Sequence, residues 1–150
     1  MGENEGFYFK HRVDKNAIPT CTILGVEIAA INMEWLINYI NNHIKEMAGD
    51  YICVSNVHTT ITAYEDSAYR KIQNGGIMAI PDGGPLSTVG RKMGYKSMQR
   101  TTGPGLMEEI FKISVKNGYR HFFYGSTEET LKKLQRTLLN VYPGIQIVGM

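Results

Sequence analysis

The sequence lacks several features that would place it in a class at once. It has only two cysteines, Cys21 and Cys53, so buried free thiols in a reducing compartment are the default interpretation. No apolar run approaches the roughly 20 residues of a membrane-spanning helix, and the polar, charged segment 1–15 is no secretory signal. The formal net charge is +2, which gives no argument for binding nucleic acid. We therefore expect a cytoplasmic protein, for which attachment to the inner face of the cell membrane stays open.

Motifs of common catalytic and metal sites are also absent. The chain has no Cys/His cluster at zinc spacing, no Gly-x-Ser-x-Gly elbow, and neither a Gly-x-Gly-x-x-Gly nor a Walker pattern. It has no Asp-x-Asp pair, the usual acidic clamp for a metal-bound nucleotide sugar. We therefore expect no metal and no cofactor. Arginine, lysine and backbone N–H groups would have to balance any bound phosphate.

Short strand-like runs alternate with helix-like segments along the chain. The strand-like runs are two pieces of 19–28 around Gly25, then 51–54, 77–80, 121–124 and 145–148. The segments with helical spacing are 33–47, 57–74 with a break near Asp66, 85–93, 103–117 and 127–142. This order predicts an α/β, Rossmann-like fold: a mostly parallel sheet with helices on both faces, preceded by a short β-hairpin.

The domain organisation follows from the same pattern. Residues 1–18 are expected to form a flexible N-terminal arm, and residues 19–150 a single domain with a core of its own. Its composition, 43% hydrophobic and 20% charged, is typical of a soluble globular protein. The chain stops directly after a strand, where a doubly wound sheet would continue into another crossover. We therefore expect the domain to be truncated at its C-terminus.

The segment Ile77–Pro85 is the most informative part of the sequence. A buried strand-like run ends at Pro81, presents one carboxylate at Asp82, and turns through two glycines into a helix that begins near Pro85. Open α/β sheets bind their ligands at the carboxyl ends of the strands, so Asp82 is a candidate general base. The alternative is an aspartate that bonds its own backbone in a turn.

Other polar residues follow the predicted strands and would share that edge of the sheet. Asn56 and Thr59 follow the second strand, and Arg100 stands in the connection before the helix at Gly103. Gly125 and Ser126 follow a third strand and precede a helix whose N–H groups could hold a phosphate, although this signal is weaker. Each has a structural alternative: Asn56 and Thr59 as helix caps, Arg100 as a solvated charge, and Ser126 as the N-cap of a capping box with Glu129.

Taken together, three segments resemble the WecG/TagA/CpsF glycosyltransferase family. They are Val54-Ser-Asn-Val-His-Thr-Thr-Ile-Thr-Ala-Tyr-Glu-Asp66, Ile80-Pro-Asp-Gly-Gly-Pro-Leu86 and Arg100-Thr-Thr-Gly-Pro-Gly-Leu-Met107. The helix 127–142 and the following Pro143-Gly-Ile-Gln-Ile-Val-Gly149 match as well. The motifs keep their order and spacing, and the resemblance covers about residues 19–149.

The resemblance implies an inverting transferase that moves a sugar, often N-acetylmannosamine, from a UDP-sugar to a lipid-diphosphate-linked sugar of undecaprenyl type. Such enzymes make bacterial surface polysaccharide or teichoic acid. It implies Asp82 as the general base, Arg100 at the diphosphate, and Asn56, Thr59, Gly83 and Gly103 as substrate-binding residues, without a metal. It also implies that the family's second half, with a membrane-contacting C-terminal part, is missing here. No nucleic-acid partner is expected, and a homo-oligomer stays open.

A second interpretation belongs to a different class. A chain that carries only the first half to two thirds of the enzyme would bind an acceptor or a partner subunit without turnover. A generic nucleotide-binding module is a third and weaker interpretation, because no phosphate-loop fingerprint is present.

Overall fold

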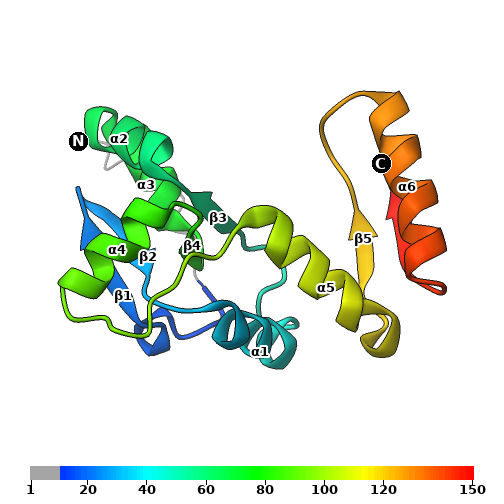
Figure 1. Cartoon of the computed structure of the whole chain (residues 1–150), viewed down its shortest axis with the longest axis horizontal. Coiled ribbons are helices and arrows are strands. Elements are labelled where there is room, and N and C mark those ends of the chain that lie inside the picture. The colour runs from blue at the N-terminus through cyan, green and yellow to red at the C-terminus, as the bar shows by residue number, and fades with distance from the viewer. Residues whose placement is uncertain (1–10) are drawn as a thin grey trace, which may run out of the picture. The chain divides into compact units, whose positions relative to one another are not determined.

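The computed structural model describes residues 11–150. The chain divides into two compact units, one that ends at Gly103 and one that comprises Pro104–Met150 (Figure 1). The sequence predicted a single domain over residues 19–150, but the strands separate into a four-stranded and a two-stranded sheet. Each unit is therefore described by itself.

Residues 11–18 are packed against the N-terminal unit. They contain the short 3-10 helix η1, Lys15–Ala17, which Asp14 caps, and the side chains of Val13 and Ile18 are buried. Lys15 donates from Nζ to the carbonyl oxygens of Asn74 and Gly76, at 2.9 and 2.6 Å. The prediction of a flexible arm is therefore wrong for residues 11–18, and its remainder, residues 1–10, lies outside the described residues.

The four-stranded sheet of the N-terminal unit has the strand order β1-β2-β4-β3. Its strands are β1 (Thr20–Ile23), β2 (Val26–Ala29), β3 (Ile52–Ser55) and β4 (Met78–Pro81). β1 and β2 form an antiparallel hairpin, and β4 runs parallel to both β2 and β3. Leu24 and Gly25 connect the hairpin with φ angles of 50° and 82°, the left-handed pair that a tight two-residue turn requires. The expected hairpin and parallel sheet are confirmed.

Four helices flank this sheet: α1 (Met33–His43), α2 (Val57–Glu65), α3 (Ser67–Gly75) and α4 (Gly84–Lys92). Asn32 caps α1 through its side chain. Asp66 separates α2 from α3, because its carboxylate accepts hydrogen bonds from the backbone N–H groups of Ala68 and Tyr69. The break predicted near Asp66 is thus a cap that ends one helix and starts the next.

One buried cluster joins the sheet to its helices. It contains Cys21, Val26, Ile28, Ala30, Ala63, Ala79, Leu86 and Met98. Burial raises the pKa of the Cys21 thiol, and both cysteines are free, as the sequence suggested. This core fixes the position of β4 and α4, and therefore of the loop between them.

The C-terminal unit is a β-α-β arrangement preceded by a helix. It consists of α5 (Gly103–Asn117), β5 (Arg120–Phe122), α6 (Glu128–Val141) and β6 (Gln146–Gly149), with β5 and β6 parallel. Phe111, Leu138 and Ile145 form its core. Alternate strand residues face outward, so Phe122 is 64% exposed. The strand-like run at 121–124 thus forms the short strand β5, none of whose residues is buried.

The start of α6 also differs from the prediction. Its N-cap is Thr127, whose hydroxyl accepts a hydrogen bond from the N–H of Thr130 at 3.2 Å. Ser126 precedes the cap, with a φ of 64°, and cannot make the predicted capping box in that conformation.

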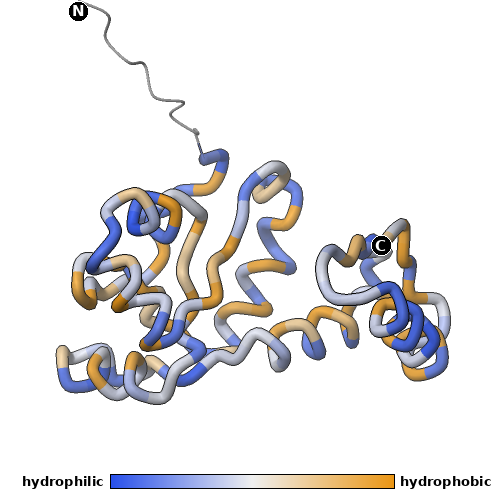
Figure 2. The backbone as a smooth tube through the Cα atoms, turned by 90° about the horizontal axis from the view of Figure 1, so that it is seen from above, coloured by the Kyte–Doolittle hydropathy of each residue, from blue (hydrophilic) through white to orange (hydrophobic). Residues whose placement is uncertain are grey.

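Hydrophobic and hydrophilic residues alternate along the helices (Figure 2). Within residues 11–150, no helix combines the length and the apolar character that crossing a membrane requires.

Candidate active site

The carboxyl ends of β3 and β4 bring two of the predicted residues together. The strands pair in parallel up to Ser55 and Pro81, so Asn56 and Asp82 both follow directly at one edge of the sheet. The N–H of Asp82 donates to the carbonyl of Ser55 at 2.8 Å, which extends the pairing by one residue. Ser55 is fully buried, and its hydroxyl donates to Gln73 Oε1 at 2.6 Å. The hydroxyl of Ser55 therefore has its hydrogen-bond partner inside the core, which fixes the end of β3.

The carboxylate of Asp82 is partly exposed and is not used by the fold. Its side chain is 25% exposed, and within residues 11–150 no hydrogen bond engages its oxygens. The turn interpretation required those oxygens to bond the local backbone, which they do not. Gly83, not Asp82, is the N-cap of α4, and no side chain caps that helix. Asp82 thus presents an acceptor that a bound hydroxyl could use.

Arg100 lies beside Asp82. Its Nε donates to the backbone carbonyl of Asp82 at 2.8 Å, and its Nη2 is 3.9 Å from Asp82 Oδ1. The side chain is 61% exposed, so this long ion pair contributes little to stability. The segment is anchored on both sides, since Gln99 N–H donates to Ile31 O and Thr101 N–H to Pro81 O. The backbone contact orients the guanidinium, whose N–H groups can donate to an anion in pairs.

The backbone at Gly83 lies next to the start of α2. A Cβ at this position would lie 3.6 Å from Asn56 Cα and from the backbone nitrogen of Val57. The first turns of α2 and α4 therefore meet beside Asp82. N–H groups in the first turn of a helix have no intrahelical acceptor, so this edge carries positive partial charge.

Asn56 and Thr59 form a capping box at the start of α2. Asn56 Oδ1 accepts from Thr59 N–H, and Thr59 Oγ1 accepts from Asn56 N–H, each at 3.0 Å. The structural alternative given for both residues is therefore correct. Among the described residues, Asn56 Nδ2 has no partner and remains a potential donor, whereas binding of a sugar by Thr59 would compete with the cap.

The other predicted residues lie elsewhere. Gly103 packs against β3, since a Cβ there would lie 3.4 Å from Val54 Cγ1. Gly125 and Ser126 form the turn between β5 and α6 in the C-terminal unit, with φ angles of 110° and 64°. The structure therefore brings together Asn56, Thr59, Asp82, Gly83 and Arg100, and phosphate binding at Gly125 and Ser126 stays a prediction.

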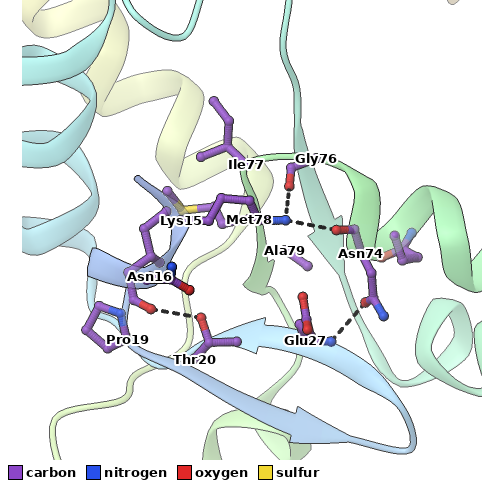
Figure 3. A pocket seen from close by; sticks show the side chains of 12 residues that line it. Lys15, Asn16, Pro19, Thr20, Glu27, Asn74, Gly76, Ile77, Met78 and Ala79 are labelled. Carbon is purple, nitrogen blue, oxygen red and sulfur yellow. Dashed lines mark hydrogen bonds between the residues drawn. The ribbon is translucent and has the colours of Figure 1, made fainter. Parts of the chain in front are cut away.

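Sequence reasoning missed a pocket of about 600 Å³ at the opposite end of β4 (Figure 3). Its walls come from segments between Lys15 and Ala79, and Lys15 reaches across it to the end of α3. No local motif signals a pocket built from such distant segments. Its two central polar groups already serve the fold: Lys15 caps carbonyls of α3, and Asn74 bonds Gly25 O and Glu27 N–H. The carboxyl edge, with its unused carboxylate, is the better candidate site.

The structure also bears on metal binding. Among residues 11–150, no three side chains of His, Cys, Asp or Glu gather in a way that could hold a metal ion. Activity without a metal stays a prediction.

The chain is similar to one characterised enzyme over much of its length. It is 22% identical over 107 residues to the N-acetylglucosaminyldiphosphoundecaprenol N-acetyl-beta-D-mannosaminyltransferase of Bacillus spizizenii, a match that covers 71% of this chain. It spans only 42% of that relative. A sequence model of the glycosyl transferase WecG/TagA/CpsF family matches residues 21–150, nearly the whole described chain and all of the candidate site. The chain therefore belongs to the WecG/TagA/CpsF family of glycosyltransferases.

Proposed function

We propose that this chain acts in an inverting glycosyltransferase that uses Asp82 as its general base. The observation that carries the proposal is the unused, partly exposed carboxylate of Asp82 at the carboxyl edge of β4, in a chain of a glycosyltransferase family.

In this proposal Asp82 removes the proton from the acceptor hydroxyl as the oxygen attacks the anomeric carbon. The new C–O bond forms on the face opposite the departing diphosphate, and that bond breaks with its electron pair on the phosphate oxygen. One displacement inverts the anomeric centre, by the in-line logic of inverting sugar hydrolysis. Positioned proton removal contributes on the order of a hundredfold to ten-thousandfold in rate.

Arg100 would balance the charge of the leaving diphosphate. Its Nε donates to the carbonyl of Asp82 at 2.8 Å and its Nη2 lies 3.9 Å from Asp82 Oδ1, so the guanidinium is held beside the carboxylate. A guanidinium binds phosphate oxygens in a bidentate manner, which a lysine ammonium cannot do. The first turn of α4 and Asn56 Nδ2 would add neutral donors beside it.

The relative suggests the substrates. Its name describes transfer of an N-acetylmannosaminyl group to N-acetylglucosaminyldiphosphoundecaprenol. We extend this to a UDP-linked donor and a lipid-diphosphate-linked acceptor, met at the cytoplasmic face of the membrane in the synthesis of a surface polymer.

The rival proposal is a fragment that binds an acceptor or a partner without turnover. A transfer assay with a panel of UDP-sugars and a short lipid-diphosphate acceptor separates the two. Product from this chain, or from a version extended to the relative's length, with an inverted anomeric configuration, supports the transferase. No product from either version, while the acceptor still binds, would favour the fragment.

A further inference from the structure

The end of α4 and the loop that follows it lie at the periphery of the N-terminal unit (Figure 1). Their residues form an exposed basic surface. Arg91 and Lys92 lie in the last turn of α4, and Lys96 lies in the loop. Every residue of 91–97 is exposed. Between Asp82 and Glu108 the chain has no aspartate or glutamate, so no neighbour in sequence offsets these charges.

The same surface carries large apolar side chains. Val89, Met93 and Tyr95 are 41%, 50% and 36% exposed. Val89, Lys92 and Met93 stand at helical spacings of three and four, so they share one face. The buried face of α4 consists of Leu86, Ser87 and Gly90. We call Val89, Arg91, Lys92, Met93, Tyr95 and Lys96 the α4 surface.

The α4 surface is anchored from beneath. Met98 is fully buried, with its sulfur 3.8 Å from Cys21 Sγ. Arg91 ties the helix end to the loop, because its Nη1 donates to Met98 O at 2.9 Å. Lys92 and Lys96 form no ion pair within residues 11–150, so their charges face solvent. Because Met98 is buried and Arg91 bonds its carbonyl, the loop is fixed in position, and Met93 and Tyr95 stay exposed to solvent.

We propose that the α4 surface rests on a bilayer that contains anionic phospholipid. Lysine and arginine are attracted to the negative headgroups, while methionine, valine and tyrosine side chains enter the boundary between headgroups and acyl chains. Nucleic acid explains the charges less well, because Val89 and Met93 would then lie against phosphates. The loop that carries Lys96 leads directly to Arg100, so the bilayer and the candidate site are connected through four residues.

The proposal assigns a membrane contact of the proposed transferase to the α4 surface, and to that extent it rests on the proposed function. Vesicle binding is measured without turnover, so each can fail alone. The test is flotation of this chain with vesicles of phosphatidylcholine, with and without one third phosphatidylglycerol. We expect binding to the anionic vesicles only, weakened by added salt because salt screens exposed charges.

Two variants locate the contact. Lys92→Glu with Lys96→Glu should weaken partitioning at least about 25-fold, since each basic side chain near an anionic surface contributes about fivefold. Met93→Ser should weaken it without changing the net charge. Lys45→Glu with Lys71→Glu, an equal charge change at exposed positions outside the α4 surface, should retain most of the binding.

Three results would overturn the proposal: equal losses in both double variants, wild-type binding by the Lys92/Lys96 variant, or absence of vesicle binding by the wild type. Binding of single-stranded DNA in place of vesicles, lost in the Lys92/Lys96 variant, would assign the surface to nucleic acid instead.

Discussion

At the scale of residues, the candidate site depends on how each polar group is already used. Asn56 Oδ1 and Thr59 Oγ1 are committed to a cap. The Asp82 carboxylate has only the long ion pair with Arg100 at 3.9 Å. The sequence could predict that these residues lie near one another, because parallel strands end at one edge. It could not predict which of their polar groups make hydrogen bonds within the protein. That depends on tertiary contacts such as Arg100 Nε to Asp82 O at 2.8 Å.

We predict that Arg100→Lys in an active version lowers kcat/KM at least about tenfold, because lysine replaces a bidentate fork with a single point charge. Arg136→Lys, at an exposed position of α6, is the matched control and should change little. Steady-state kinetics with the donor varied give the result. Unchanged kinetics in Arg100→Lys would make Arg100 a solvated charge.

At the scale of elements, the sequence predicted those turns and helix ends that depend only on neighbouring residues. The hairpin around Gly25 and the break near Asp66 were both predicted, because each depends on residues within one turn. The predicted helix over 33–47 instead ends at His43, although apolar spacing continues to Met47. The exposure of β5 depends on whether a second layer covers it, which no local pattern records.

The capping box of α2 allows stability and activity to be separated. Asn56→Ala should destabilise the fold by about 1 kcal/mol through loss of the cap, measured by urea unfolding, whereas Asn56→Asp should retain stability. Asn38→Ala, at an exposed position within α1, is the control for helix composition.

If Asn56 Nδ2 binds substrate, Asn56→Asp should still lose activity in an active version, because its carboxylate has no N–H to donate. Full activity in that variant would leave Asn56 with a capping role alone.

At the scale of the whole molecule, the sequence predicted the α/β class but not its division. The alternation of strands and helices is the same whether the strands form one sheet or a four-stranded and a two-stranded sheet. The chain divides into two compact units, and the single domain over residues 19–150 stays a prediction. Their separation depends on contacts between residues far apart in the sequence, which periodicity does not encode.

The C-terminal unit presents Phe122 and Val148, which are 64% and 57% exposed. Such apolar groups on strands tend to find another chain. We predict that this chain self-associates at micromolar concentration, as measured by light scattering. Phe122→Ser with Val148→Ser should reduce the apparent mass, whereas Leu24→Ser, at an exposed hairpin turn, should not. A monodisperse monomer of the wild type would contradict this expectation.

We also predict that activity survives chelation. Phosphate charge at the candidate site would be balanced by Arg100 and by helix N–H groups, so EDTA should leave the transfer rate within about twofold, a change below about 0.5 kcal/mol in the barrier. Loss of activity with EDTA and recovery with magnesium or manganese would reveal a metal site outside this account.

The central claim is that Asp82 is the general base of a sugar transfer. Its most direct test is the turnover number of Asp82→Asn in an active version. Glu65→Gln, an exposed acid at the end of α2, serves as the matched control, and circular dichroism and urea unfolding verify folding. The account predicts a loss of about two orders of magnitude or more for Asp82→Asn with unchanged stability. Turnover within about threefold of the wild type, a barrier change below about 0.7 kcal/mol, would contradict it and remove Asp82 from the mechanism.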